Sequence, residues 1–419
     1  MPASTLFVGI DVDSKSNKVR FIDSDGRDLS KPLSVKNTPK GASEIERKIL
    51  ELVNKHGFHA VRIGLEATGY YDWHLAEYLA QSPHRTHIHI EVYRLDPRRI
   101  RNFKKSYAKE DKTDPFDALV VADFLRFNRL PKPHRASNPF EALRHLTRYR
   151  FHLVRIIVRE QNFLLSRLFL QFSGFQQNKP LSDTFGAISQ ALLENFTPDE
   201  LVSMPQEKLL EFVIRHGKNR VREPELLVKT LKRAAKESYR LRPALRRTLG
   251  LVLCLSLRNI RTLRTALRDV DKAIAKELEA FPNTLTSVPG IGPVYSAGLI
   301  AELGEIERFS SHNKIAKMAG LVWPKKQSGH FEAQDLRRAK HGNRYLRYYF
   351  VEAANALRVH NAEYRTYYEQ KLKEVRKHAH KRAVVLTARK LVRLVFSMLK
   401  KNQLYSASYQ QPTRSNRSQ

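Results

Sequence analysis

The chain has very little cysteine, since Cys254 is the single thiol among its 419 residues. One cysteine excludes an internal disulfide and any zinc site built from several cysteines. Long apolar runs are also lacking: the longest, LGLVLCLSL around residue 253, is shorter than the roughly 18 residues that a membrane span needs. The N-terminal stretch MPASTLFVGID has neither the basic nor the apolar segment of a signal peptide. We therefore expect a cytoplasmic protein with no membrane-spanning segment.

Acidic residues are scarce as well. The 42 Asp and Glu residues face 75 Lys and Arg residues, which gives a formal net charge of +33. So large an excess of one sign indicates an anionic partner, with nucleic acid first and an acidic membrane surface second. Hydrophobic residues make up 42% of the chain, enough to build cores, and the length predicts several structural units.

Residues 1–135 have the pattern of an α/β domain. Three strands are predicted between LFVGIDVD and LSVKNT, with a turn at DSDG. A helix (GASEIERKILELVNKHG), a strand (HAVRIGLEAT), a helix (YDWHLAEYLAQ), a strand (HIHIEVY) and a helix starting at DPFD follow in that order. This order predicts a mixed sheet covered by helices.

The segment 136–282 changes to long helices. One covers EALRHLTRYRFHLVRIIVREQNFLLSRLFLQF, and a second is centred on the apolar residues between Leu253 and Ile274. Both have near-heptad spacing, which fits either a coiled-coil stalk or dimer interface, or an ordinary helix pair within one chain. We expect residues 173–245 to form a helical insert between them.

The segment 283–375 is expected to be mostly α-helical. Its PGIGP turn is similar to a helix-hairpin-helix element, whose glycines bring backbone N–H groups close to a phosphate; the alternative is a plain turn. The segment 376–419 is predicted to be a basic helix followed by a disordered tail. Residues 371–401 hold eleven Lys and Arg residues and one Glu, a composition suited to a phosphate backbone.

Three carboxylates cluster in EDKTDPFDAL, at Asp111, Asp114 and Asp117. One interpretation is a helix start, with Asp114 as the N-cap and Asp117 facing the positive end of the helix dipole. The other is metal binding, because residues three apart on a helix point the same way. The two interpretations are compatible.

Two further acids occupy positions in apolar strands, where a carboxylate is unfavourable unless it has a structural or functional role. Asp11 lies inside an apolar strand, and Glu66 ends another. A strand, a neighbouring strand end and a helix start can converge at one edge of a sheet, and Mg²⁺ prefers such oxygen ligands. Asp13 could substitute for Asp11 on the same face, and Asp111 for Asp114.

These stretches carry a resemblance. GIDV, LEATG and KTDPFDA resemble the acidic site of the RuvC-like, RNase H-like domain of DEDD transposases in the one-ten insertion-sequence family. That family includes Piv-type invertases and bridge-RNA-guided recombinases. In the second half, SVPGIGPVYSAGLIAELGEIERF, KMAGLVWPKKQSG and KHGNRYLR resemble the C-terminal transposase domain of the same family.

The resemblance implies a DNA recombinase that uses Mg²⁺. It assigns the metal-binding catalytic tetrad to Asp11, Glu66, Asp114 and Asp117, and the catalytic nucleophile to Ser328. It implies double-stranded target and donor DNA and a structured noncoding guide RNA as partners. It also implies homodimers or tetramers, in which the serine of one subunit could complete the carboxylate site of another. The residues expected to contact nucleic acid are Lys112, Gly290, Gly292, Lys325, Lys326, Lys340, Asn343, Arg344 and Arg347.

The residues around Ser328 can also be interpreted without the resemblance. WPKKQSGHF is predicted to be a loop from its proline and glycine, and the hydroxyl needs a base or metal to become a nucleophile. A Ser-Gly pair without such chemistry is a turn. His330 and Phe331 depart from the glycine-rich or basic stretch that family members often carry after QSG. Two rival functions stay open: a junction endonuclease that uses water, and a nucleic-acid-binding protein without catalysis.

Overall fold

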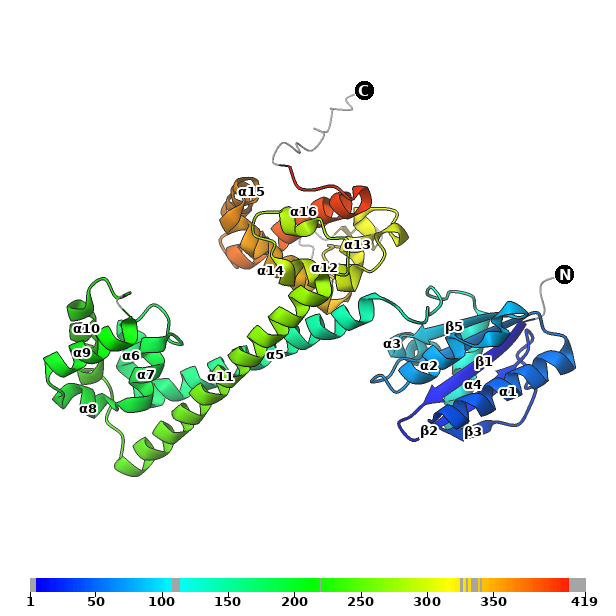
Figure 1. Ribbon diagram of the computed structural model, residues 1–419, viewed down its shortest axis with the longest axis horizontal. Coiled ribbons are helices and arrows are strands. Elements are labelled where there is room, and N and C mark those ends of the chain that lie inside the picture. The colour runs from blue at the N-terminus through cyan, green and yellow to red at the C-terminus, as the bar shows by residue number, and fades with distance from the viewer. Residues whose placement is uncertain are drawn as a thin grey trace, which may run out of the picture. The chain divides into compact units, whose positions relative to one another are not determined.

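Two compact units make up the chain, the sheet unit Met1–Pro139 and the helical unit Phe140–Gln419 (Figure 1). A computed structural model describes the residues 5–107, 114–218, 220–324, 327–328, 331–332, 338–339 and 341–406. Within these residues, no helix is both long enough and apolar enough to cross a membrane.

A five-stranded mixed sheet forms the centre of the sheet unit. Its strands are β1 (Thr5–Val12), β2 (Ser16–Ile22), β3 (Leu33–Lys36), β4 (Ala60–Glu66) and β5 (His89–Leu95). They lie in the order β3-β2-β1-β4-β5. The pairs β1–β2 and β2–β3 are antiparallel, whereas β1–β4 and β4–β5 are parallel. The predicted meander followed by alternating helices and strands is therefore confirmed.

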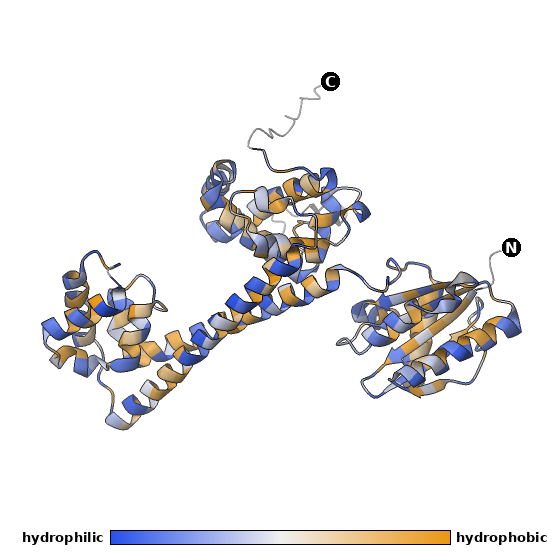
Figure 2. Ribbon diagram, viewed as in Figure 1, coloured by the Kyte–Doolittle hydropathy of each residue, from blue (hydrophilic) through white to orange (hydrophobic). Residues whose placement is uncertain are grey.

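Helices cover both faces of this sheet. They are α1 (Pro39–His56), α2 (Trp73–Ala80), the short η1 (Pro83–Thr86), α3 (Pro97–Lys104) and α4 (Asp114–Arg126). Because side chains alternate along a strand, Val8 and Ile10 of β1 share a core with α1 and α2, while Phe7 shares one with α3 and α4. The strands and the inward sides of the helices accordingly carry the hydrophobic residues (Figure 2).

Helix α3 was not predicted from the sequence. Its eight residues, PRRIRNFK, bury only Ile100, so they show no apolar period. Asp96 starts the helix by accepting a hydrogen bond from the Arg98 backbone N–H at 2.8 Å. The Phe103 ring then packs edge-on against Phe124 of α4, with ring centroids 5.3 Å apart. Helix α3 is thus fixed against α4 by aromatic packing.

Helix α4 packs directly onto the backbone of β1 at Gly9. A Cβ atom on Gly9 would lie 2.1 Å from the Ala118 carbonyl oxygen and 2.3 Å from the Ala122 nitrogen. At the other end of α4, Arg126 Nε donates to the Ser24 carbonyl at 3.1 Å, just beyond β2. Helix α4 therefore runs antiparallel to β1, and its first turn lies at the C-terminal end of that strand.

The helical unit is built on two long helices. They are α5 (Phe140–Gln171) and α11 (Pro243–Leu278), which run antiparallel (Figure 1). Arg150 Nε donates to Asp271 Oδ1 at 2.6 Å, and Ser256 Oγ donates to Glu160 Oε1 at 2.6 Å. Of the two predicted arrangements, the structure contains the helix pair within one chain.

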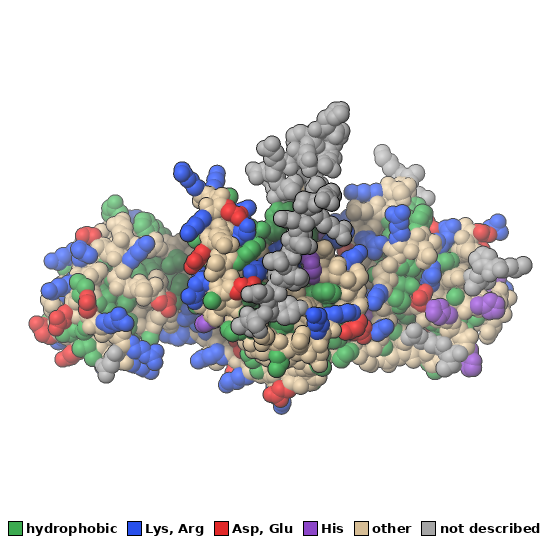
Figure 3. Space-filling view, turned by 90° about the horizontal axis from the view of Figure 1, so that it is seen from above, with side chains coloured by type: hydrophobic (Ala, Val, Ile, Leu, Met, Phe, Trp, Pro, Cys, Tyr) green, Lys and Arg blue, Asp and Glu red, His purple; other side chains and the backbone are tan. Residues whose placement is uncertain are grey.

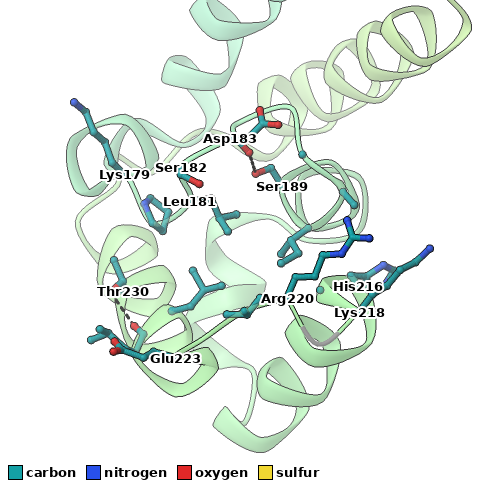
Figure 4. Close-up of a pocket in the computed structure, with 18 residues that line it drawn as sticks. Lys179, Leu181, Ser182, Asp183, Ser189, His216, Lys218, Arg220, Glu223 and Thr230 are labelled. Atoms are coloured by element: carbon teal, nitrogen blue, oxygen red, sulfur yellow. Dashed lines mark hydrogen bonds between the residues drawn. The ribbon is translucent and has the colours of Figure 1, made fainter. Parts of the chain in front are cut away.

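The predicted helical insert lies between α5 and α11. It consists of α6 (Ser173–Asn178), α7 (Ala187–Asn195), α8 (Pro198–Ser203), α9 (Gln206–Gly217) and α10 (Pro224–Lys236). These helices share a core with the ends of the long pair. A cavity of about 800 Å³ opens among them, with Lys179, Lys218 and Arg220 among its lining residues (Figure 4).

The C-terminal part of the helical unit is mostly α-helical, as expected. Its elements are η2 (Leu285–Ser287), α12 (Pro293–Leu303), η3 (Ile306–Arg308), α13 (His312–Ala319), β6 (Gln327–Ser328), β7 (Phe331–Glu332), α14 (Arg344–His360), α15 (Ala362–Lys373) and α16 (Ala379–Lys401). The predicted basic helix is α16. Its apolar residues Leu391, Val392 and Val395 lie fully buried in the core that α12 and α14 also build.

Gly9→Ala should destabilise the sheet unit by about 2 to 3 kcal/mol, because the new methyl group overlaps the backbone of α4. Thermal and urea unfolding of the full chain measure this loss. Gly250→Ala in α11 is the control, since a Cβ there would meet Gln171 Nε2 at an ordinary contact distance of 3.7 Å and alanine favours helix. Equal stability of the two variants would contradict the close packing of α4 on β1.

Candidate active site

Asp11 and Glu66 lie at the same edge of the sheet. Ile10 of β1 is in register with Leu65 of β4, so the next residues in the two parallel strands are Asp11 and Glu66. Both carboxylic residues are half-buried. Glu66 is also the last residue of β4 that pairs with β5, opposite Leu95. The two acids thus come from neighbouring strands at their C-terminal ends, as predicted.

Asp117 of α4 reaches the same edge. Burial raises the pKa of Glu66 most, and the negative charge of Asp117 also raises it. Thr68 opposes the shift by donating its hydroxyl to Glu66 Oε1 at 3.4 Å. Arg101 and Lys104 of α3 also lower the pKa of Glu66. Carboxylates and cations therefore act on one another at this edge.

Lys104 forms an ion pair with Asp117. Its ammonium group also lies over the ring of Phe116, 5.4 Å from the centroid. The Asp117 side chain remains 39% exposed. Sequence reasoning missed Lys104 because the helix that carries it, α3, has no apolar period.

The other acids considered for this site, Asp13, Asp111 and Asp114, have different positions. Asp114 is the first residue of α4, while Asp111 and Lys112 lie outside the described residues. Asp13, considered as a substitute for Asp11, lies in the turn after β1. Its carboxylate accepts hydrogen bonds from the Lys15 backbone at 3.2 Å and from Ser14, and the former lowers its pKa most. Asp13 is exposed and holds this turn.

The donor set fits a divalent cation of the Mg²⁺ type. Two half-buried carboxylates on adjacent strands and a third on α4 supply hard oxygen ligands, and the like charges of Glu66 and Asp117 favour a cation between them. In the described part of the chain, no three His, Cys, Asp or Glu side chains already lie close enough to hold an ion. In this arrangement the Lys104 ammonium supplies the positive charge beside Asp117.

Ser328 lies in the helical unit. The sequence predicted a loop, which is wrong at this residue: Ser328 ends β6 and pairs with Phe331 of β7 in a short antiparallel ribbon. Two-residue strands have too few positions to show alternation, so the pattern of residues could not reveal them. Lys325, Lys326 and Lys340 lie outside the described residues.

The two glycines of PGIGP have different surroundings. Gly290 has a φ of +96°, and a Cβ there would meet His360 Cβ at 3.2 Å. A turn with this backbone, packed against α14, requires glycine. Gly292 precedes α12, and a Cβ there would have no neighbour within 4 Å. Of the two, Gly292 leaves open space in which a phosphate could approach the backbone.

The motif KHGNRYLR places three candidate residues at the start of α14. Asn343 caps the helix by accepting from the Tyr345 N–H at 2.9 Å, and Arg347 donates to the Ala319 carbonyl at 3.1 Å. Arg344 is exposed and stacks over the ring of Tyr345, 4.8 Å from its centroid. Among the three, Arg344 therefore presents its cation to solvent.

Sequence reasoning also missed the buried carboxylate of Glu302. It accepts from Arg148 Nε at 2.6 Å and from Asn343 Nδ2 at 2.6 Å, and so joins α12 to both α5 and α14. The available signal was an acid inside the apolar stretch LIAELG, the same kind of signal that singled out Asp11. Glu302 fixes the frame on which the C-terminal motifs sit.

Two family models match the chain. One, described as a transposase and belonging to the DEDD type of IS110 elements, covers residues 8–172, and the other, described as "Transposase IS116/IS110/IS902 family", covers residues 283–369. The 42 kDa protein of insertion element IS900 from Mycobacterium paratuberculosis is 26% identical over 317 residues, which cover 74% of this chain and 76% of the relative. The 44.8 kDa protein of insertion element IS116 from Streptomyces clavuligerus is 27% identical over 312 residues, with the same coverage of 74% and 76%.

The DEDD-type model covers the sheet domain with acids at its edge together with α5, and this match identifies an insertion-sequence transposase of the DEDD type. The chain belongs to the IS116/IS110/IS902 transposase family. The resemblance noted in the sequence and the predicted α/β fold class followed by helices are therefore confirmed. Membership implies that the protein acts on DNA, and a DEDD domain indicates that it uses a divalent metal ion.

Lys104→Met should tighten the binding of Mn²⁺, used as a probe for the divalent site, because the ammonium group no longer competes for Asp117. Titration calorimetry on the full chain measures the change, for which we expect about a tenfold gain, equivalent to about 1.4 kcal/mol. Lys105→Met is the matched control: it removes the same charge one residue later, at an exposed position. Equal gains in the two variants would show a general charge effect and contradict competition at Asp117.

Proposed function

We propose that this transposase cuts and rejoins DNA by using Ser328 as the nucleophile at a scissile phosphate, with Asp11, Glu66, Asp114 and Asp117 holding Mg²⁺. The observation that supports this most strongly is the meeting of Asp11, Glu66 and Asp117 at one sheet edge. A bound Mg²⁺ supplies Lewis-acid stabilisation of charge on the phosphate oxygens. The nearby cations Arg101 and Lys104 attract the DNA backbone to the carboxylates.

The proposed chemistry exchanges one phosphate ester for another. The Ser328 hydroxyl oxygen attacks the phosphorus, and the bond from phosphorus to a deoxyribose oxygen breaks. The serine proton leaves its oxygen, and the departing deoxyribose oxygen gains one, so a phosphoserine and a free hydroxyl result. The free hydroxyl of the exchanged partner then reverses the reaction and releases Ser328. Because each step forms one phosphate ester bond for each one that it breaks, rejoining needs no external energy source.

We further propose a structured noncoding RNA guide, and double-stranded target and donor DNA, as the partners of a homodimer or tetramer. The net charge of +33 supports binding of several polyanions at once. Lys and Arg side chains spread over the visible face and outnumber carboxylates there (Figure 3). The exposed Val158 and Phe169 of α5 and Leu251 of α11 support a contact between subunits along the long helices. Such a protein works in the cytoplasm of a prokaryotic host, where its DNA lies.

Wild type should form a covalent adduct with labelled donor DNA in the presence of guide RNA and Mg²⁺, visible on a denaturing gel. Ser328→Ala should bind the same nucleic acids and form no adduct, because the attacking oxygen is gone. Asp11→Asn should lose the adduct as well, since it removes a ligand charge at constant size. Asp13→Asn is the matched control, as Asp13 holds only the exposed turn after β1, and we expect it to keep the adduct.

Two results would contradict the proposal in different ways. Strand cleavage by Ser328→Ala at the wild-type rate would favour an endonuclease that uses water. Adduct formation by Asp11→Asn at the wild-type rate would show that the carboxylate edge has no part in the reaction, and Asp11 would be a structural residue.

A further inference from the structure

The turn that follows Glu66 places an aromatic residue in an unusual backbone conformation. The Tyr71 N–H donates to the Thr68 carbonyl at 3.2 Å, and φ is +60° at Gly69 and +76° at Tyr70. Positive φ at both central residues is the pattern of a type I′ turn, which normally takes glycine or asparagine there. A bulky tyrosine at such a φ is strained, and strain of this kind collects at functional sites.

Two aromatic side chains stand out from this turn. Tyr70 is 51% exposed and Tyr71 is 50% exposed, so neither ring contributes its full area to the core. The Tyr71 ring lies beside Gly69, where an added Cβ would meet its Cε2 atom at 3.5 Å. Two large aromatic side chains at adjacent positions thus expose about half of their area to solvent.

The turn is held rigidly from both sides. Asn37 Nδ2 donates to the Asp13 carbonyl at 3.0 Å and to the Tyr71 carbonyl at 3.1 Å, which ties the turn to the end of β1. The fully buried Asp72 accepts from Arg94 Nε at 2.5 Å and from Arg94 Nη2 at 3.2 Å. These contacts therefore maintain the strained conformation and fix the position of the backbone that carries the two rings.

The same turn belongs to the carboxylate edge. Thr68, its first residue, donates to Glu66, and the charges of Arg101 and Lys104 act on Glu66 as well. One edge thus combines acids, cations for phosphates and exposed aromatic faces. Proteins that bind single-stranded nucleic acid use such cations to contact the phosphate backbone and such aromatic rings to stack against the bases.

We propose that Tyr70 and Tyr71 form a stacking platform for unpaired nucleobases of the DNA strand beside the scissile phosphate. This inference rests on the proposed function, since it places the cleaved strand at the carboxylate edge. Unpaired bases offer a π-face that duplex DNA hides, so the platform would prefer a strand opened at the cleavage point. The platform fixes where the scissile phosphate lies relative to Glu66.

The test uses the full chain carrying Asp11→Asn, so that no cleavage occurs, and a short single-stranded DNA with one 2-aminopurine. Stacking quenches the fluorescence of this base, so the parent protein should quench it at one nucleotide position. Tyr70→Gly and Tyr71→Ala should each reduce the quenching and weaken single-strand binding about tenfold, the scale of one stacked base. Tyr71→Phe should keep both, because stacking needs the ring and not the hydroxyl. Duplex binding should stay unchanged.

Stability separates stacking from a structural role. Tyr70→Gly relieves the positive φ, so its thermal midpoint should equal or exceed that of the parent while its stacking is lost. Tyr239→Ala, at a 77% exposed tyrosine of the insert, is the control and should change neither quantity. Unchanged quenching in both Tyr70→Gly and Tyr71→Ala would overturn the platform. A lower midpoint in Tyr70→Gly, with single-strand and duplex binding weakened alike, would also overturn it in favour of a structural tyrosine.

These binding measurements need neither Ser328 nor a bound metal, so their failure is distinct from failure of the proposed chemistry. A platform that is absent while the covalent adduct still forms would leave the serine mechanism standing. A platform that is present while no adduct forms would leave a strand-binding edge without that mechanism.

Discussion

The packing of α4 onto the backbone of β1 is the contact on which the sheet unit's candidate site depends. Gly9 leaves no side chain between the strand and the helix, so α4 sits closer to β1 than any other residue would allow. Asp11 lies two residues further along the same face of β1, and the first turn of α4 lies at that end of the strand. A side chain at position 9 would push Asp117 away from Asp11 and Glu66 together, although it touches none of them.

A basic protein clusters carboxylates here because they have cations to oppose them. Glu66 is half-buried beside the like charge of Asp117, an arrangement that is unfavourable for two isolated carboxylates. Lys104 and Arg101 offset it in the structure, and a divalent ion would offset it more strongly. Helix α3, which brings these two residues, is therefore as much part of the site as the strands that bring the acids. The same cations attract phosphate groups, so the charges that stabilise the edge also draw in the DNA backbone.

The sequence was sufficient where a residue pattern repeats over many positions. The β-branched run of β1, the alternation in β4 and the helical spacing of α1, α5 and α11 predicted those elements. An acid within one apolar strand and an acid at the end of another pointed to Asp11 and Glu66. Prediction from the sequence failed for elements whose residues show no repeating pattern. Helix α3 buries only Ile100, and the ribbon at Ser328 has two residues in each strand, so neither shows a repeat.

Partners that lie far apart in the chain were also beyond prediction. The ion pair of Lys104 with Asp117, the bonds of Glu302 to Arg148 and Asn343, and the strain at Tyr70 each depend on tertiary contacts. The motif KHGNRYLR identified Asn343 as important without separating a role in capping α14 from a role in binding nucleic acid. The cap and the bond to Glu302 are what the structure shows for it.

The most direct measurement is anomalous X-ray diffraction from crystals of the full chain soaked in Mn²⁺. We expect a manganese peak at the C-terminal ends of β1 and β4, within coordination distance of Asp11, Glu66 and Asp117 and with Lys104 turned away from Asp117. The ion would lie about 2.0 to 2.2 Å from carboxylate oxygens, as hard divalent cations of this size do. Crystals that take up manganese elsewhere, with Lys104 still paired to Asp117, would contradict the claim that this edge is a metal site.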